Sequence, residues 1–530
     1  MAFNLPPETL QKIFDYINDD DFNTFQSLIL VNRDWCQNSI MLLWKKPFHN
    51  KLRFKNLYKI ISVILAFLDD ERKQYLNITD ARLEIQAKVL FDYPSFIKEL
   101  NFKAIVFLLK EWINRKEKIR PILAPDYFTT HEKEYIAKFN DYKYMEVITP
   151  KALFINQERI AFVDAIYHVI SRNNNALKSL ILDKPYMVMY DMFKPFYQEI
   201  ISSNPGFLNQ LELINFYYDR NCPEILEEFS KITNNLKSIH IGFQYHISDC
   251  MGEDGLIQFI KSQNNLEHVA LDGYEGSRLA DIHNSLITQA HSLRTFKIWF
   301  TDIDLNCLNF LGECQNLEEL EFGCIDFYSV YEGNFPKLKK LKIYDPYFID
   351  HEINHSIPLS LITNVGKYLS KCVFMVDSEH SLSLIQTIAT SCPNLVSLTF
   401  RIQSRNELDE LIKHFDDKFQ KLEVLKICNY FGDDDEYWMI DECIREFFLK
   451  IPKNVRKLDI SKWVINIKLL EDYLHCIKRP LKKFQFTFHG EIHEIGNLVK
   501  KFSIEKSWSI KGVAPTSRFY YCHIIKIEWD

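Results

Sequence analysis

The chain has 530 residues, a formal net charge of −7 and a hydrophobic content of 47%, with only 14 glycines. This composition excludes a disordered or fibrous chain, and the length exceeds what one compact core usually accommodates. The acidic balance leaves no footprint for nucleic acid, so we expect no nucleic-acid partner.

The N-terminus and the cysteines indicate an intracellular protein. The first residues contain no basic leader followed by an apolar stretch, and the apolar run around Ile61–Leu68 is too short to span a bilayer. The twelve cysteines form no Cys-x-x-Cys pair, which disfavours a zinc site. We therefore expect a cytoplasmic and/or nuclear location, reduced thiols, no membrane association and no cofactor.

Residues 1–48 are expected to form three short helices. Proline near the first helical position costs no hydrogen bond and Glu8 suits the positive end of a helix, so the first helix should begin near Leu5–Glu8. Asp19–Asp21 interrupts the apolar pattern, and Asn32 is placed to cap the third helix. So short a segment cannot bury its apolar stripes alone and therefore needs a partner.

The order of these residues resembles the F-box. Leu-Pro-x-Glu, an Ile-Phe stripe and an acidic linker are followed by leucines, Val-Asn-Arg-x-Trp and a terminal Leu-Trp, although the order Trp35-Cys36 reverses the Cys-x-x-Trp of many F-boxes. The resemblance implies docking on a Skp-family adaptor and, through it, on a cullin in an SCF-type ubiquitin ligase. By position it assigns adaptor contacts to Leu5, Pro6, Leu10, Ile13, Phe14, Leu28, Val31 and Trp35. In the alternative interpretation, these helices pack only against Leu57–Leu68.

Residues 49–170 predict a helical connector. Their apolar residues have helical spacing without a repeated phrase, and several prolines divide the segment. A connector of this kind would also seal the first of the repeats that follow, because the exposed end of a solenoid needs a cap.

A phrase of the form Leu-x-x-apolar-x-apolar recurs through residues 171–530. Its steps average about 28 residues, near the upper end of the ~20–29 residues typical of leucine-rich repeats. The member at Leu369 is weak, because Cys372 would be its middle apolar residue. The first leucines or their equivalents are Leu177, Leu208, Leu236, Leu266, Leu293, Leu317, Leu338, Leu369, Leu395, Leu422, Val455 and Leu481.

The alternating end of each phrase predicts a short strand, and the segments between phrases change to helical spacing. Amphipathic helices are expected at 255–263, 278–290, 406–419 and 467–477. This alternation resembles the leucine-rich-repeat fold, an α/β solenoid with parallel strands inside and helices outside, ending here in a C-terminal cap.

The inner side of the strands is the predicted target surface, because alternate strand residues point away from the core. The aromatic and basic side chains along it suit an acidic or phosphorylated segment. We predict target contacts at Trp299, Lys340, Lys342, Tyr344, Arg401, Lys426, Lys457 and Lys483. The equally plain alternative is that these are ordinary solvated strand positions.

One motif suggests catalysis. His351–His355 fits His-Glu-x-x-His, but Pro346 and Pro358 bracket it, so a zinc peptidase is a distant third hypothesis. The acidic run Asp433–Glu436 is interpreted as a solvated loop. We therefore expect no enzyme activity but the substrate-recognition subunit of a ubiquitin ligase, with a repeat scaffold unrelated to ubiquitin as the alternative.

Overall fold

The computed structural model describes most of the chain. The residues described are 6–17, 21–48, 58–79, 83, 90–115, 150–173, 177–182, 205–218, 222–243, 253–274, 279–300, 310–323, 335–344, 359–376, 381–402, 404–429, 441–476, 481–489, 492–506, 509–519 and 522–529. They divide into two compact units, an N-terminal unit of residues 1–242 and 250–266 and a C-terminal unit of residues 243–249 and 267–530.

The N-terminal unit combines helices with the first parallel strands. Its strands are β1 (Glu99–Asn101), β2 (Ser179–Leu182), β3 (Leu213–Tyr218) and β4 (Ser238–Phe243). Its helices are α1 (Pro7–Asp15), α2 (Phe22–Leu28), α3 (Arg33–Leu43), α4 (Lys59–Leu65), α5 (Asp70–Tyr75), α7 (Tyr93–Phe96), α8 (Phe102–Arg115), α10 (Pro150–Asn173), η2 (Pro205–Leu208), α12 (Cys222–Ile232) and α13 (Glu253–Lys261).

A buried polar contact ties the helices of the connector together. The Trp112 indole of α8 donates a 2.7 Å hydrogen bond to the Ser62 hydroxyl of α4, and its ring lies edge-on to Phe162 of α10. Trp112 is fully buried, so this bond satisfies its only polar group. The helices expected in this segment are therefore present and share one core.

The structure adds a strand to the segment expected to be helical. β1 pairs in parallel with β2, and Glu99 lies in register with Ser179. The carbonyl oxygen of Lys45 accepts hydrogen bonds from the N–H groups of Lys98 and Glu99 at 2.9 and 3.1 Å. The same two-donor pattern recurs where Lys98 meets β2, so the stacking of repeats begins directly after α3.

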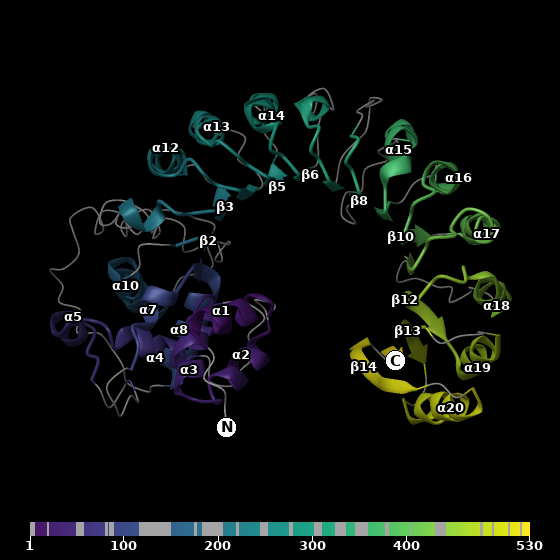
Figure 1. The fold of residues 1–530 in the computed structure, drawn as a ribbon, viewed down its shortest axis with the longest axis horizontal. Coiled ribbons are helices and arrows are strands. Elements are labelled where there is room, and N and C mark those ends of the chain that lie inside the picture. The colour runs from purple at the N-terminus through teal and green to yellow at the C-terminus, as the bar shows by residue number, and fades with distance from the viewer. Residues whose placement is uncertain are drawn as a thin grey trace. The chain divides into compact units, whose positions relative to one another are not determined.

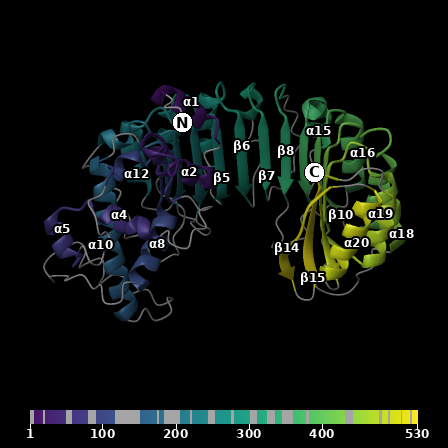
Figure 2. The same cartoon turned by 60° about the horizontal axis from the view of Figure 1, so that its bottom comes forward.

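In the C-terminal unit, each parallel strand lies beside the next one along the chain from β5 to β13 (Figure 2). The helices lie on the outer side of these strands (Figure 1). The strands are β5 (His268–Tyr274), β6 (Thr295–Phe300), β7 (Glu319–Gly323), β8 (Lys340–Tyr344), β9 (Lys371–Met375), β10 (Ser397–Ile402), β11 (Val424–Asn429), β12 (Lys457–Ile465), β13 (Lys483–His489), β14 (Ile510–Phe519) and β15 (Cys522–Trp529). The helices are α14 (Leu279–Leu286), η3 (Ile287–Gln289), α15 (Leu359–Val365), η5 (Gly366–Tyr368), α16 (Ser381–Ser391), α17 (Arg405–Lys413), α18 (Asp441–Lys450), α19 (Ile467–Cys476) and α20 (Ile492–Glu505).

The expected α/β solenoid of strands and outer helices is confirmed by these strand pairings. The first leucines of the phrase are buried, with at most 5% exposure. Cys372, the weak member, lies in register with Leu341 and Leu398, so the repeat near Leu369 is real. The sheet ends differently, because β15 and β14 pair antiparallel and form its last two strands.

One repeat is shifted relative to the prediction. Ser179 pairs with Leu213, so the equivalent of Leu177 is Leu211 and not Leu208. The stretch Phe207–Phe216 contains two overlapping phrases, and Leu208 lies in η2. Both leucines are buried, and the strand-pairing register is what separates them.

Asparagines tie neighbouring repeats together at the turns before β7, β10 and β12. The amide of Asn316 donates to the His291 carbonyl oxygen at 2.7 Å, and that of Asn394 donates to the Lys367 carbonyl oxygen at 2.8 Å. Asn454 makes the same contact with Gln420. The asparagine that often precedes the first leucine thus satisfies a backbone carbonyl of the preceding repeat.

Candidate protein-binding surfaces

The two helices after α1 are held by side-chain caps. The Asp21 carboxylate accepts a 3.1 Å hydrogen bond from the Thr24 N–H at the start of α2. The Asn32 amide oxygen accepts a 2.9 Å bond from the Trp35 N–H at the start of α3, which confirms the predicted cap. These bonds satisfy donors that the first turn of a helix leaves free.

Two of the residues predicted to contact the adaptor are buried in this chain. Leu10 and Phe14 are each only 1% exposed, and the Phe14 ring lies edge-on to Trp35 with centroids 5.6 Å apart. Both therefore form the core that joins α1 to α3. The apolar stripe of α1 therefore packs inward at Leu10 and Phe14.

Other apolar side chains of this segment remain exposed. Ile13 and Val31 of the predicted set are 39% and 53% exposed, and Leu30 and Tyr16, which were not predicted, are 83% and 93% exposed. Pro6 is exposed, Leu28 and Trp35 are partly buried, and Leu5 lies outside the described residues. Five of the twelve large apolar side chains exposed in the described residues belong to residues 13–41. Such clustering marks interaction surfaces more often than scattered exposed leucines do.

The inner face of the C-terminal unit (the side of β6–β13 opposite the helices) carries an aromatic platform made by Trp299, Gly323 and Tyr344. These residues lie in one row on β6, β7 and β8. The two rings stack with centroids 4.9 Å apart and an interplanar angle of 26°. A Cβ atom on Gly323 would lie 2.3 Å from the Trp299 ring, so glycine is what lets the indole lie over β7.

A lysine–glutamate network (Lys297, Glu319, Glu321, Lys340 and Lys342) borders this platform. The Lys342 ammonium donates to Glu319 and Glu321 at 2.6 and 3.0 Å, and Lys340 donates to Glu319 at 3.2 Å. Lys297 approaches Glu321 at 3.4 Å. The predicted basic residues Lys340 and Lys342 are thus balanced by acids on the next strand.

The network shifts the pKa of its members. Partial burial alone would raise the pKa of Glu319, but hydrogen bonds from Lys342 and Lys340 outweigh it and lower the pKa to about 2. Burial would lower the pKa of Lys342, but its bonds to Glu319 and Glu321 raise it. Burial chiefly raises the pKa of Tyr344, and Glu321 adds to this. All three groups therefore keep their ordinary charges near neutral pH.

The remaining predicted target residues fall into three classes. Arg401 is buried, with only 1% exposure. Lys426 lies 3.1 Å from Asp459. Lys457 and Lys483 are neighbours in register on β12 and β13, and neither makes an ion pair within the described part of the chain.

The pairing of Glu319 and Glu321 with lysines is visible in the sequence, although it is not among the predicted contacts. Glu-x-Glu at 319–321 and Lys-x-Lys at 340–342 occupy the same positions of consecutive repeats, 21 residues apart. Residues at equivalent positions of consecutive parallel strands lie side by side. The spacing alone therefore predicts these cross-strand pairs.

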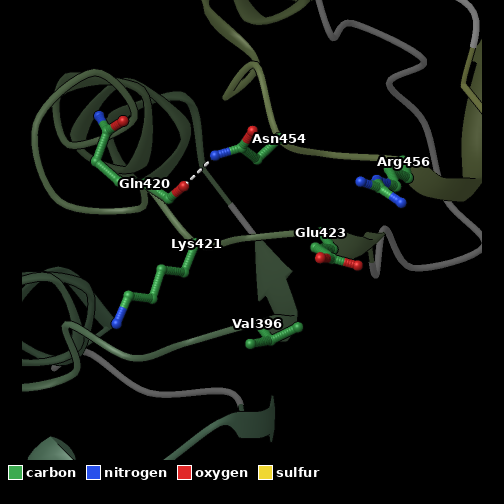
Figure 3. Close-up of a pocket in the computed structure, with 6 residues that line it drawn as sticks. All are labelled: Val396, Gln420, Lys421, Glu423, Asn454 and Arg456. Atoms are coloured by element: carbon green, nitrogen blue, oxygen red, sulfur yellow. Dashed lines mark hydrogen bonds between the residues drawn. The ribbon is translucent and has the colours of Figure 1, made fainter.

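A hollow of about 370 Å³ opens where the strands begin (Figure 3). It is lined by Val396, Gln420, Lys421, Glu423, Asn454 and Arg456. The Asn454–Gln420 contact between repeats borders it. Most of its lining residues are polar or charged, and none belongs to the predicted target surface.

Neither the zinc motif nor the acidic run can be placed. Both His351–His355 and Asp433–Glu436 lie outside the described residues. Among the residues that are described, no cluster of three or more His, Cys, Asp or Glu side chains could hold a metal ion. In the same residues, no helix has the length and apolar character needed to cross a bilayer.

A leucine-rich-repeat structure is among the solved structures similar to this chain. No protein-family model matches the chain, and no curated protein matches it. The crystal structure of the leucine-rich repeat-containing protein LegL7 from Legionella pneumophila is similar, with a TM-score of 0.33 and 12% sequence identity. The match covers 51% of this chain and 90% of that chain. The TM-score and the sequence identity are both low, so the fold described above rests on the strand pairings of this chain.

Proposed function

We propose that the chain is the substrate-recognition subunit of an SCF-type ubiquitin ligase. The α1–α3 segment would dock on a Skp-family adaptor, and the repeats would hold the protein to be ubiquitylated. The observation that carries the proposal is the exposed apolar surface of Ile13, Tyr16, Leu30 and Val31, within residues whose order resembles the F-box. Burying such anchors in an interface supplies most of its binding energy.

The proposed mechanism is proximity rather than chemistry on this chain. A target held on the repeats has a high effective concentration near an enzyme recruited through the adaptor. A backbone contact between the end of α3 and the first strand supports this, because the carbonyl oxygen of Lys45, two residues beyond α3, accepts hydrogen bonds from the N–H groups of Lys98 and Glu99 at β1. A short link between docking helices and repeats would restrict how far a bound target can move.

To test this proposal, the full-length chain is expressed in cells and precipitated, and the adaptor and cullin that precipitate with it are measured. Leu30→Asp combined with Val31→Asp should abolish both signals, because two charges would enter the proposed interface. Leu449→Asp combined with Ile504→Asp is the matched control, since these residues are 61% and 72% exposed on α18 and α20. Point variants are preferable to deleting residues 1–48, because that deletion also removes the Lys45 carbonyl bonded to β1.

The second candidate is a repeat scaffold without a ligase role. The inner face of the C-terminal unit favours it, because an aromatic platform bordered by charges suits a protein partner with or without ubiquitin. Recovery of a partner without adaptor or cullin, unaffected by the Leu30 and Val31 variants, would support this candidate and overturn the first.

A further inference from the structure

We propose that the inner face of the C-terminal unit binds an extended, carboxylate-rich segment of a partner protein with one aromatic or aliphatic anchor residue. The anchor would rest on the aromatic platform, and the carboxylates would lie over the lysines of β9, β12 and β13. This inference rests on the protein-binding part of the proposed function and is independent of the ligase.

The anchor site follows from the packing of Trp299. Its indole lies over Gly323 and stacks on Tyr344, which fixes both rings before any partner arrives. Both side chains remain partly exposed on the inner face. Rigid, partly exposed aromatic surfaces are favoured anchor sites, because little conformational entropy is lost on binding.

The charge of the network argues against a basic anchor. Three lysines share two glutamates beside the platform, which leaves one surplus positive charge. An arginine or lysine placed over Trp299 would therefore meet a cationic border, although cation–π contacts favour such a placement on isolated rings. An uncharged anchor is compatible with this border.

The charge of the whole inner face argues for an acidic segment. Apart from the buried Arg401, the described inward side chains of β6–β13 include seven lysines against Glu319, Glu321 and Asp459. Asp272 of β5, in register with Trp299, adds a fourth acid, so the surplus is three positive charges. The chain as a whole carries −7. A positively charged face attracts acidic partners.

The lysines without ion pairs mark where the carboxylates would lie. Lys371, Lys457 and Lys483 occupy the same row of the inner face, and none of them makes an ion pair within the described residues. Lys457 and Lys483 are like charges in register on neighbouring strands and repel each other, and Glu528 of β15, in register with Lys483, offsets only part of this repulsion. Carboxylates bound along this row would reduce the repulsion between its lysines.

The distances suit a short peptide. Strands lie about 4.8 Å apart, so the five steps from β8 to β13 span roughly 24 Å, and the four-residue offset between the rows of Tyr344 and Lys483 adds roughly 13 Å along the strands. An extended chain covers the resulting diagonal of roughly 27 Å with about eight residues at roughly 3.3 Å each. One anchor followed by acidic residues over that length would contact both features at once.

The experiment measures fluorescence anisotropy of labelled ten-residue peptides with the purified full-length chain. The probe carries one phenylalanine followed by glutamates. Matched probes replace phenylalanine by serine, glutamates by lysines, or two glutamates by phosphoserine. We expect the first probe to bind at low salt and weaken as salt rises, the serine probe to bind about tenfold more weakly, and the lysine probe not to bind. Binding of the phosphoserine probe alone, or equal binding of all probes, would overturn the proposal.

Variants locate the site. Lys457→Glu combined with Lys483→Glu should weaken the acidic probe by about tenfold or more. Lys418→Glu combined with Lys500→Glu makes the same charge change outside the inner face and should leave affinity unchanged. Equal weakening by both pairs would mean nonspecific attraction and would contradict the assignment. The Lys457 and Lys483 variant should still bind the adaptor, so failure here is distinguishable from failure of the ligase proposal.

Discussion

Glu319 is the residue at which the charge state of the inner face is most directly testable. Its pKa of about 2 in the folded chain lies below the usual 4.5, so its ionised form stabilises the fold. That contribution is complete above pH 4.5 and is lost as pH falls through about 2. Because the group keeps some contact with solvent, we expect only about 1–2 kcal/mol.

Glu319→Gln should therefore lower the urea midpoint of the C-terminal unit at pH 7. It should also flatten the loss of stability between pH 4.5 and pH 2, which can be followed by circular dichroism. Glu423→Gln is the control, since Glu423 makes no ion pair in the described residues. An unchanged pH profile in Glu319→Gln would show that the network does not stabilise the fold.

Gly323 is the second residue with a sharp expectation. Gly323→Ala would place a methyl group against the Trp299 ring, and the whole ring would have to shift because it cannot bend. We expect a loss of about 1–3 kcal/mol and an altered near-ultraviolet circular dichroism spectrum, as the indole leaves Tyr344. Gly312→Ala is the control, because its added Cβ would meet no atom within 4 Å. Identical behaviour of the two variants would contradict the described packing.

At the residue scale, sequence periodicity separated core from surface on strands better than on α1. Strand alternation placed Trp299, Lys342 and Tyr344 correctly on one face because the period is two. It failed at Arg401, which has the inward position yet is buried. On α1 the apolar stripe was recognised, but a stripe does not tell whether its neighbour is another helix of the chain or a partner.

The cap of α3 gives the prediction at the scale of elements. Asn32→Ala removes the acceptor for the Trp35 N–H and should cost about 1 kcal/mol of stability. Asn32→Asp retains an acceptor oxygen and should cost much less. Thermal unfolding of both variants by circular dichroism checks the difference. Equal losses would mean that the side-chain bond does not hold this helix end.

The elements themselves were largely predictable, and the exceptions have physical reasons. Repetition fixed the strands of β4–β13, since the same phrase recurs with a buried first leucine. The shift from Leu208 to Leu211 arose where two phrases overlap, and only pairing with β2 decides between them. β1 has only three residues, and Ile97 stands where the phrase has its first leucine. Ile97, Leu100 and Phe102 nevertheless fit the phrase and are buried, so a search that accepted isoleucine would have predicted this strand.

At the scale of the whole molecule, one chain joins the proposed docking segment to a repeat array. The N-terminal unit contains both the exposed side chains of residues 13–41 and the first strands, and the C-terminal unit contains the aromatic platform and the lysine row. The sequence predicted the solenoid because a phrase that recurs at a regular spacing can be recognised in a single sequence. It could not supply the partners, because exposed surface shows what chemistry would fit and not which protein carries it.

The most direct test of the central proposal is the affinity of the purified full-length chain for a purified Skp-family adaptor, measured by calorimetry. The account predicts saturable binding that Leu30→Asp with Val31→Asp abolishes and that Leu449→Asp with Ile504→Asp leaves intact. Absence of binding to the intact, folded chain, or binding that the Leu30 and Val31 changes do not alter, would contradict it.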